Sequence, residues 1–447
     1  MRPTLLQTAL AGVSLAAITA GSASAGGFSV AEYSVRDLGQ ANAGYAAYAE
    51  DASTIWANPA GLAALEDFTV TTGAHYIIGR GEFIDQGSRG AAGGPLAGGE
   101  EDDLFEDTAV PNLYAALPIG DGRIVAGLGV SAPFGLATDY APGSVTRYQS
   151  LESSLQVVDI NPSFAVQVTD ELSIGFGVSA QYADAELTNA VDFGALCLGQ
   201  VEPTAPGTCA PLGLTPQMAD GLATVEGDSW AWGANAGLRW TPAEGTHVGL
   251  SYRSEVSHEL EGDADYDTPA AAAALFAPAF TDTPARADLD LPAEAAVSVS
   301  HAATGRLDLN ASIVWKGWSS VDALAVDFEN PAQPDTSEPL NYSDTIKVSA
   351  GAEYEWTPEL TVRGGVAFDE SPTDETFRSP RVPDSNRTIV AAGVSWTPAP
   401  DWTIDAGWQH LFFEDAPIDT TGPGGDRLLG ETENAADIVS IGVSWRM

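Results

Sequence analysis

The most regular feature of this chain is an alternation of apolar and polar residues in segments of about ten residues, which starts at Phe68 and recurs to the C-terminus. Residues 360–369 and 439–447 show it, and residues 307–316 show it best. There the apolar set is Leu307, Leu309, Ala311, Ile313 and Trp315, and the mostly polar set is Asp308, Asn310, Ser312, Val314 and Lys316. A period of two indicates β-strands whose faces meet different environments. So many such segments favour a membrane barrel with the apolar face outward.

The connections between these segments alternate in length. Short turns containing Gly, Pro or Asp lie at residues 119–122, 169–170, 241–245, 302–305, 356–359 and 398–401. Long polar stretches lie near residues 79–108, 133–154, 188–227, 261–284, 319–341, 370–384 and 414–433. Outer-membrane barrels have short periplasmic turns and long extracellular loops. The alternation therefore predicts fourteen antiparallel strands, with both ends of the barrel sequence on the periplasmic side. A β-sandwich also has many short strands, but it does not predict this alternation.

Large aromatic residues lie at the ends of many segments, where they suit the girdles at the two membrane interfaces. They are Tyr76, Trp240, Tyr252, Trp315, Trp318, Trp356, Trp396, Trp402, Trp408 and Trp445.

The region upstream of the first strand lacks the alternation. Residues 1–25 combine Arg2, an apolar run and an Ala-x-Ala end, which predicts a secretory signal peptide and a mature chain from Gly26. No later apolar run reaches the roughly 18 residues of a transmembrane helix.

Residues 26–66 are predicted to fold inside the lumen as a hatch, with a small periplasmic domain as the alternative. Residues 67–447 are assigned to the barrel.

The charge of the chain excludes one class of partner. There are 18 Lys and Arg residues against 62 Asp and Glu residues, which gives a formal net charge of -44. A nucleic acid held by phosphate neutralisation is therefore not expected. The acidic run at residues 100–103 could hold Ca²⁺, although such a run is more often a solvated loop.

Cys197 and Cys209 are the cysteines of this sequence and lie close together in one long loop. An exported chain meets an oxidising compartment, so a local disulfide is expected, with two free buried thiols as the alternative.

Several stretches are specific enough to suggest a family. Residues 26–63, which contain the hatch element Asn58-Pro59-Ala60, resemble the N-terminal hatch of the FadL family, outer-membrane transporters of long-chain fatty acids and other hydrophobic compounds. Further similar stretches are residues 133–140, 161–182, 249–263 and 365–387. The resemblance covers nearly the whole chain. It implies an all-β fold, a fourteen-stranded transmembrane barrel plugged by an N-terminal hatch.

The resemblance also implies a passive route for a hydrophobic ligand. The ligand would be captured between the loops at 133–154 and 188–227, bind at the hatch near Phe28, and leave sideways into the membrane beside a kinked third strand. Hatch movement would govern release. Gly127 and Gly129 are the expected site of the lateral opening, because glycine inside a strand weakens pairing and often marks a bend.

The expected head-group site departs from the family pattern. In the fatty-acid transporters, basic residues follow a tyrosine of the fifth strand, whereas here Tyr182 is followed by Asp184 and Glu186. Lys347 and Arg363 lie on the polar faces of their segments and are the candidate cations for a carboxylate. Alternatively, they pair with lumen acids such as Glu353, Asp308 or Asp405. The acids after Tyr182 favour neutral or weakly polar ligands slightly over free fatty acids.

The expected partners follow from the same interpretation. They are a hydrophobic small molecule, lipopolysaccharide and outer-membrane lipid, and the barrel assembly machinery, for a protein that is a monomer. That machinery commonly reads a C-terminal aromatic residue, and this chain ends in Met447.

Two other classes of function compete with transport of hydrophobic compounds. A general porin for small hydrophilic solutes shares the barrel but lacks the hatch. An outer-membrane hydrolase needs a catalytic motif, and the sequence contains neither G-x-S-x-G nor H-E-x-x-H. In the pairs Ser257-His258 and Ser300-His301, neighbours on a strand point to opposite faces. No enzyme activity, cofactor or metal is therefore expected.

Overall fold

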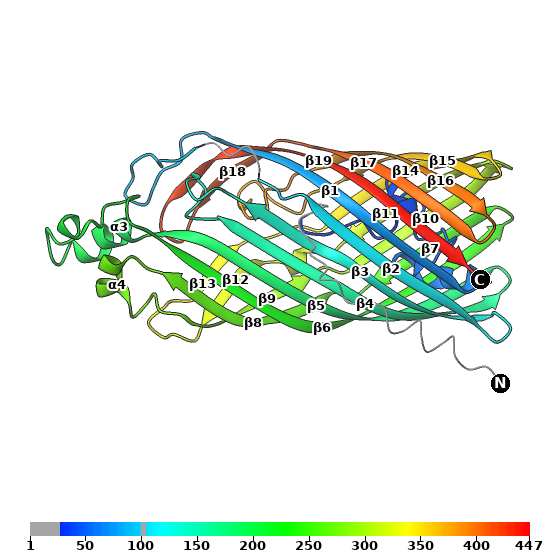
Figure 1. The fold of residues 1–447 in the computed structure, drawn as a ribbon, viewed down its shortest axis with the longest axis horizontal. Coiled ribbons are helices and arrows are strands. Elements are labelled where there is room, and N and C mark those ends of the chain that lie inside the picture. The colour runs from blue at the N-terminus through cyan, green and yellow to red at the C-terminus, as the bar shows by residue number, and fades with distance from the viewer. Residues whose placement is uncertain (1–26, 100–103) are drawn as a thin grey trace.

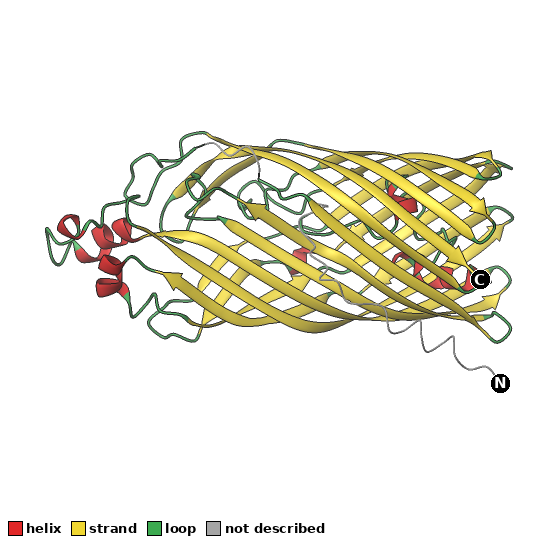
Figure 2. Cartoon of the chain, viewed as in Figure 1, coloured by secondary structure: helices red, strands yellow, loops and turns green. Residues whose placement is uncertain are grey.

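The computed structural model describes residues 27–99 and 104–447, whose strands form one closed antiparallel barrel (Figures 1 and 2). Each barrel strand pairs with the next along the chain, and β19 closes the ring on β1. The ring has fourteen strands, as predicted. The predicted signal peptide and the acidic run at 100–103 lie outside the described residues.

Nine barrel strands of the described chain are continuous. They are β1 (Thr69–Asp85), β2 (Thr108–Ile119), β3 (Ile124–Asp139), β4 (Glu152–Thr169), β5 (Leu172–Asp192), β6 (Asp220–Ala243), β15 (Leu360–Asp369), β16 (Arg387–Ala399) and β19 (Arg427–Arg446). Five others are divided into two segments. These are β7 and β8 (Thr246–Arg253, Val256–Asp267), β9 and β10 (Thr283–Leu291, Glu294–Thr304), β11 and β12 (Leu307–Lys316, Ala323–Phe328), β13 and β14 (Thr336–Pro339, Thr345–Thr357), and β17 and β18 (Trp402–Phe413, Ala416–Thr421).

The short turns lie where the sequence places them, but the strands run further into the long loops than expected. The stretch near 188–227 was predicted to be a loop, whereas β5 and β6 remain paired as far as Asp192↔Asp220. Outward side chains in this part of the wall include Asp184 and Glu226. A strand that extends beyond the lipid meets water outside, so its outer face loses the apolar residues that reveal the period of two.

The two faces of the wall have the predicted polarity. On β11, Leu309 and Ile313 are 48% and 53% exposed on the outer surface, whereas Asn310 and Ser312 are buried in the lumen. Most of the predicted girdle residues also face outward, including Trp356 and Trp402. Trp318 is an exception, because it is fully buried inside the barrel.

The chain before β1 lies in the lumen, where Figure 1 shows it in blue between the walls. It contains two one-turn helices, α1 (Val35–Leu38) and α2 (Thr54–Ala57), and the 3-10 helix η1 (Pro59–Ala64). Nearly all of its described side chains from Gly27 to Leu62 are buried. None of the helices in the described residues is long and apolar enough to cross a membrane.

Candidate functional site: a cavity above the hatch

A largely apolar cavity of about 330 Å³ lies in the barrel on the loop side of the hatch. Arg381 and Glu338 both line it, and the Arg381 Nε lies 3.4 Å from a carboxylate oxygen of Glu338. An apolar wall with a compensated ion pair suits a predominantly apolar ligand. The buried apolar residues of the wall come from the hatch, five strands and three segments between strands. They are Phe28, Leu136, Leu155, Leu260, Ala285, Val321, Val326, Leu340 and Val382.

Phe28 closes this cavity on the hatch side. Its ring packs edge-on against Trp318 at 4.8 Å between centroids and lies 6.1 Å from Phe134. The main chain around it pairs with β3, since the Val30 N–H donates to Pro133 O at 2.8 Å and the Gly135 N–H donates to Phe28 O at 2.9 Å. Residues 28–30 therefore form a short extra strand on β3.

The register of β3 breaks next to this contact, and not at the two glycines. β3 pairs with β4 as Ser131↔Asp159 and then as Phe134↔Val157, so β3 carries one extra residue. Proline has no N–H for the ladder, which accounts for a bulge at Pro133. On its other side, β3 pairs with β2 only as far as Val130. The edge that β2 leaves free is the edge that residues 28–30 cover.

Gly127 and Gly129 have a different role from the one the sequence suggested. Both lie in regular ladders with β2 and β4. A Cβ at Gly127 would lie 2.8 Å from the Ile55 side chain of α2, and a Cβ at Gly129 would lie 2.9 Å from the Tyr114 ring. Gly127 makes room for the hatch, and Gly129 makes room for the Tyr114 ring of β2 and, at 3.1 Å, for Ile55. The irregular part of the wall lies further along β3.

Asn58, Pro59 and Ala60 form a turn that rests on the wall. Asn58 Nδ2 donates to the carbonyl of Leu238 on β6 at 3.1 Å, and Asn58 Oδ1 accepts the Ala60 N–H at 3.0 Å. Pro59 starts η1, where a missing N–H costs no helical hydrogen bond. Ser173 on β5 donates to the carbonyl of Ala60 at 2.9 Å. The motif thus anchors the end of the hatch to two strands.

Lys347 lies behind the hatch, away from the residues that line the larger cavity. With Lys316 it borders a separate cavity of about 40 Å³, and its Nζ donates to Asn42 Oδ1 at 3.3 Å. Burial raises the pKa of the hatch residue Glu32, an effect that the nearby Lys347 opposes. A cavity of this size holds a water molecule and not an acyl chain. Lys347 is therefore not placed to receive a ligand carboxylate while residues 28–30 occupy this position.

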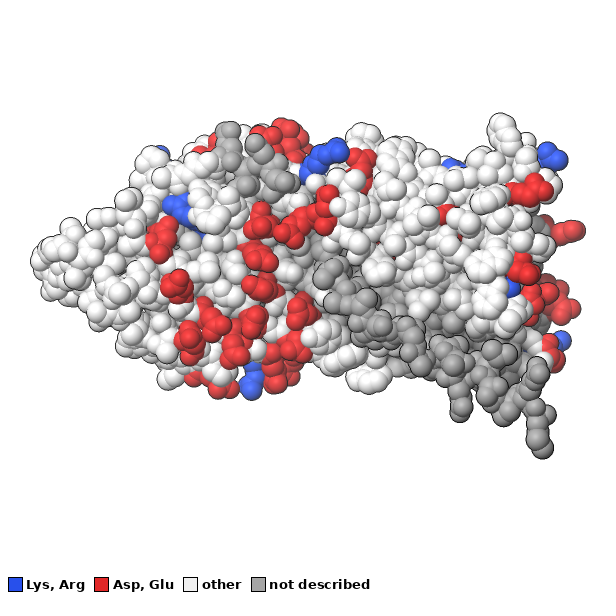
Figure 3. Space-filling model, viewed as in Figure 1, with Lys and Arg blue, Asp and Glu red and all other residues white. Residues whose placement is uncertain are grey.

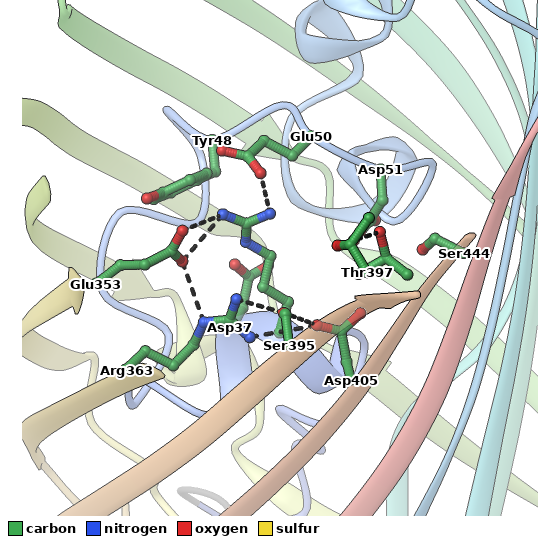
Figure 4. Close-up of polar contacts among 12 residues, drawn as sticks. Asp37, Tyr48, Glu50, Asp51, Glu353, Arg363, Ser395, Thr397, Asp405 and Ser444 are labelled. Carbon is green, nitrogen blue, oxygen red and sulfur yellow. Dashed lines mark hydrogen bonds and ion pairs between the residues drawn. The ribbon is translucent and has the colours of Figure 1, made fainter. Parts of the chain in front are cut away.

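Arg363 belongs to an ionic cluster on the periplasmic side of the hatch (Figure 4). It donates to Glu353 at 3.1 Å, to Asp405 at 3.3 Å and to Ser395 at 2.6 Å. Arg36 of α1 donates to both carboxylate oxygens of the same Glu353. Arg363 thus neutralises lumen acids, which is the alternative to ligand binding that the sequence left open.

Carboxyl groups outnumber guanidinium groups in this cluster. Asp37, Glu50 and Asp51 of the hatch lie beside Arg36 and the wall residues (Figure 4). Burial raises the pKa of Asp37 to about 7, and the neighbouring Asp51 adds to the effect. Burial also raises the pKa of Asp51. The contact between hatch and wall therefore binds protons in the physiological range.

The two cysteines are bonded in the loop between β5 and β6, with an S–S distance of 2.01 Å. The bridge joins the π-helical turn η2 (Cys197–Val201) to the residue before η3 (Ala210–Leu212), and α3 (Phe193–Leu196) precedes it. Phe193 and Phe276 of α4 (Ala270–Phe276) lie 5.9 Å apart, so this loop packs on the next one. The two loops form an apolar cluster at the far left of Figure 1.

Asp184 and Glu186 do not lie in the ligand cavity. On β5 the residues that line it are Ala185 and Leu187, and the two acids alternate with them on the outer face. The inference from these acids toward neutral ligands therefore loses its basis, because this part of β5 extends beyond the lipid, where outward side chains are polar too. On the face drawn in Figure 3, acidic side chains form a band toward the loop end, beside a belt with few charges.

The chain matches the family model for outer membrane protein transport protein (OMPP1/FadL/TodX) over residues 16–447. It belongs to this family. The chain is similar to the long-chain fatty acid transport protein of Escherichia coli strain K12, at 28% identity over 85% of this chain and 86% of that protein. This confirms the resemblance found in the sequence.

Solved structures of FadL-type proteins have the same fold. A Pseudomonas aeruginosa FadL homologue superimposes with a TM-score of 0.86 at 23% identity, covering 94% of this chain and 99% of that one. The P. putida toluene transporter TodX gives a TM-score of 0.70 at 18% identity, covering 92% and 97%. The chain is thus an outer-membrane transport protein of the FadL type and not an enzyme.

Three residues that matter in this FadL-type site were not assigned to it from the sequence. Arg381 lies in the stretch 365–387 that resembles the family, but its position at the cavity depends on how that loop folds inward. Trp318 was assigned to the girdle, because a tryptophan near a strand end gives no sign of which side of the wall it occupies. The role of Arg36 could not be predicted, since the hatch sequence has no alternation that would show which way a side chain points.

Proposed function

We propose that this FadL-type protein takes up apolar compounds across the outer membrane without an energy source. The ligand binds in the larger cavity, the segment 28–30 withdraws, and the ligand leaves sideways past the bulge of β3. The observation that carries this proposal is the position of residues 28–30. They separate an apolar cavity from the one stretch of β3 where the wall is irregular and β2 no longer pairs.

The contacts of this segment suit a movable gate. Phe28 lines the larger cavity, whereas Ser29 and Val30 line the smaller one behind it. Two main-chain hydrogen bonds hold the segment to β3, and each contributes roughly 1 kcal/mol net. Withdrawing the segment would join the two cavities and uncover the free edge of β3. An apolar molecule at that edge gains free energy by entering the lipid.

The names of the relatives support the same class of ligand. One is named as a transport protein for long-chain fatty acids and another as a transporter of toluene. Both kinds of molecule have an apolar body, which is what the cavity wall accepts. A porin for hydrophilic solutes is not supported, because the buried hatch residues fill the lumen.

Deleting Pro133 tests the lateral route, because it removes the extra residue of β3 and restores the register with β4. In cells that lack their own transporter of this family, the variant should lose uptake of radiolabelled toluene and oleate. Deleting Gly94, an exposed glycine of another loop with nothing near its Cβ position, is the matched control and should leave uptake unchanged. Heat-dependent migration on a gel would show that both barrels are folded. Full uptake by the Pro133 deletion would contradict the proposal.

A further inference from the structure

The barrel wall has a second irregularity, between the eighth and ninth barrel strands. The ladder of β10 with β11 ends at Glu294↔Lys316, and the ladder of β9 with β12 begins at Ala287↔Val326. Between these pairs the ninth strand has three more residues than the eighth. The Gly317 N–H still donates to Ala293 O at 2.9 Å, but beyond it no ladder pair joins the two strands in the described residues, so they separate in the middle of the wall.

Trp318 gives the physical reason for the separation. The 3-10 turn η4 (Trp318–Ser320) leaves the wall and carries this side chain into the lumen, where it is fully buried. Its ring packs edge-on against Phe28 at 4.8 Å and Tyr342 at 5.9 Å. On the opposite strand Pro292 has no N–H to donate across the gap. The burial of one large aromatic ring thus opens the ladder.

The larger cavity extends into this gap. In a strand, alternate residues face opposite sides, so a cavity confined to the lumen touches every second residue, as on β5. On the two edges of the gap, consecutive residues line the cavity, namely 288–290 on β9 and 320–325 on the other strand. The paired residues 285–287 beside the gap and residues 225–227 of β6 also line it. The lining includes Asp288 and Asp322, which are exposed on the outer surface. The cavity therefore reaches the outside of the barrel between these strands.

The gap lies near the outer interface of the membrane. Asp288 pairs with Glu259 on β8, and Glu261, two residues further along β8, pairs with Asp228 on β6. Trp230 lies on β6 two residues after Asp228, toward the short-turn end of the barrel. It is 60% exposed on the outer face and fits the outer aromatic girdle. The opening is thus level with the boundary between acyl chains and polar head groups.

The rim of the gap is acidic and its interior is apolar. Asp288, Asp290 and Asp322 line the rim, whereas Leu289 and Leu324 line the interior. Arg286 also lines the cavity at this edge, but Glu261 and Glu329 lie 3.4 and 3.8 Å from it and offset its charge. Carboxylates at an entrance repel an approaching anion and leave an uncharged molecule unaffected. We infer that the gap between β9 and β12 is a second side opening of the cavity, through which uncharged apolar molecules dissolved at the outer membrane surface enter in preference to fatty-acid anions.

This inference rests on the proposed uptake of apolar compounds and adds an entrance and a charge preference to it. Sealing the gap tests the entrance. Ala323 and Ala325 are small, lie on the outer face of β12 at the gap and line the cavity. The variant Ala323→Trp/Ala325→Trp should lower toluene uptake roughly fivefold, as expected if most ligand enters here. Ala406→Trp, on the outer face of the fully paired β17, is the control and should have no effect.

The rim acids test the charge preference. The triple variant D288N/D290N/D322N should raise the ratio of oleate uptake to toluene uptake roughly threefold at low salt. The triple variant D263N/D265N/D267N removes the same charge from exposed positions of β8 away from the gap, and should leave the ratio unchanged. All variants are compared at equal amounts of heat-modifiable, folded barrel.

The outcomes separate this inference from the proposed function. If the wild-type protein transports toluene and the Pro133 deletion abolishes uptake, but sealing the gap has no effect, the second opening is wrong and the proposed function stands. If the wild-type protein moves no apolar compound, the proposed function itself fails. Equal ratios in the two triple variants would overturn the charge preference.

Discussion

Arg36 of the hatch donates hydrogen bonds to both carboxylate oxygens of Glu353 in the wall, at 2.8 and 2.9 Å. Both side chains are about nine-tenths buried, and Arg363 approaches the same carboxylate from β15. Both bonds come from one nitrogen, Arg36 Nη2, and hydrogen bonds between two charged groups are stronger than neutral ones. This contact therefore sets how the plug sits against β14, on the periplasmic side of the segment that closes the ligand cavity.

Replacing Arg36 by alanine should loosen the hatch. The change removes one of the two guanidinium groups that act on Glu353 and Asp37 and leaves Arg363 as the other. Removing one partner of a buried ion pair costs about 3 kcal/mol. We expect increased ion conductance in planar bilayers, with an intact barrel on gels. Arg80→Ala is the control, because Arg80 pairs with Asp437 on the outer surface and is largely exposed. Conductance equal to wild type in Arg36→Ala would show that this contact does not hold the plug.

The hatch should be held less firmly against the barrel wall as the pH rises. Asp37 is faced by Arg36, Asp51, Arg363 and Asp405, and its pKa in the seated hatch is about 7, above its ordinary value of 3.8. Asp37 therefore binds its proton more tightly when the hatch lies against the wall than when Asp37 is exposed to water. The stability that this proton adds to the bound hatch is complete below about pH 4 and is lost as the pH rises to about 7.

The measurement for this prediction is conductance between pH 4 and pH 9. Wild type should leak more with rising pH up to about 7 and change little above it. Asp37→Asn mimics the protonated form and should flatten most of this dependence, whereas the exposed Glu50→Gln should not. An identical pH profile for wild type and Asp37→Asn would rule out Asp37 as the titrating group.

A methyl group at Gly237 should displace the hatch. A Cβ there would lie 1.8 Å from Asn58 Oδ1, and a contact of this kind forces the turn away from β6. Gly237→Ala should increase conductance and lower the melting temperature. Gly199→Ala, in an extracellular loop with nothing near the added Cβ, should do neither. Wild-type conductance in Gly237→Ala would show that the turn can shift without opening a path.

The disulfide should stabilise one loop and not the barrel. It closes a loop of 12 residues in an apolar cluster beyond the strands, and such a bridge contributes about 3 kcal/mol by restraining the unfolded loop. Replacing both cysteines by serine should leave the melting temperature of the barrel unchanged. It should speed proteolysis between Leu198 and Thr208 and weaken ligand capture. A lower melting temperature would mean that the loop cluster supports the strands.

Lys347→Met should affect charged and uncharged ligands alike. Its Nζ contacts Asn42 of the hatch behind residues 28–30, so losing it alters the hatch and not a head-group contact. Uptake of oleate and of a neutral hydrocarbon should therefore change by the same factor. Arg381→Met is the comparison, because Arg381 lines the larger cavity, and it should affect oleate more. A selective loss of oleate uptake in Lys347→Met would place the carboxylate at Lys347.

The alternation of apolar and polar residues and the composition of the turns predicted much of this fold from the sequence. The alternation of Leu309 and Ile313 with Asn310 and Ser312 marks a strand between lipid and a polar lumen, because successive side chains point to opposite faces. Short turns between such strands fix their order and antiparallel pairing. The strand number, the inside and outside of the wall, and a separate N-terminal element all follow from these local rules.

The candidate site depended on contacts between residues far apart in the chain. Nothing local distinguishes Trp318 inside the barrel from Trp315 three residues earlier, and nothing places Arg381 at the cavity or Lys347 behind the hatch. Gly127 and Gly129 suggested a bend, but the hatch residue Ile55 occupies the space beside Gly127, and the bulge occurs at Pro133. The sequence determined which residues face lipid because that is a property of each strand. Only the tertiary structure decided which lumen residues line the cavity, because the hatch sequence has no regular pattern and its packing against the wall sets which side chains stay free of it.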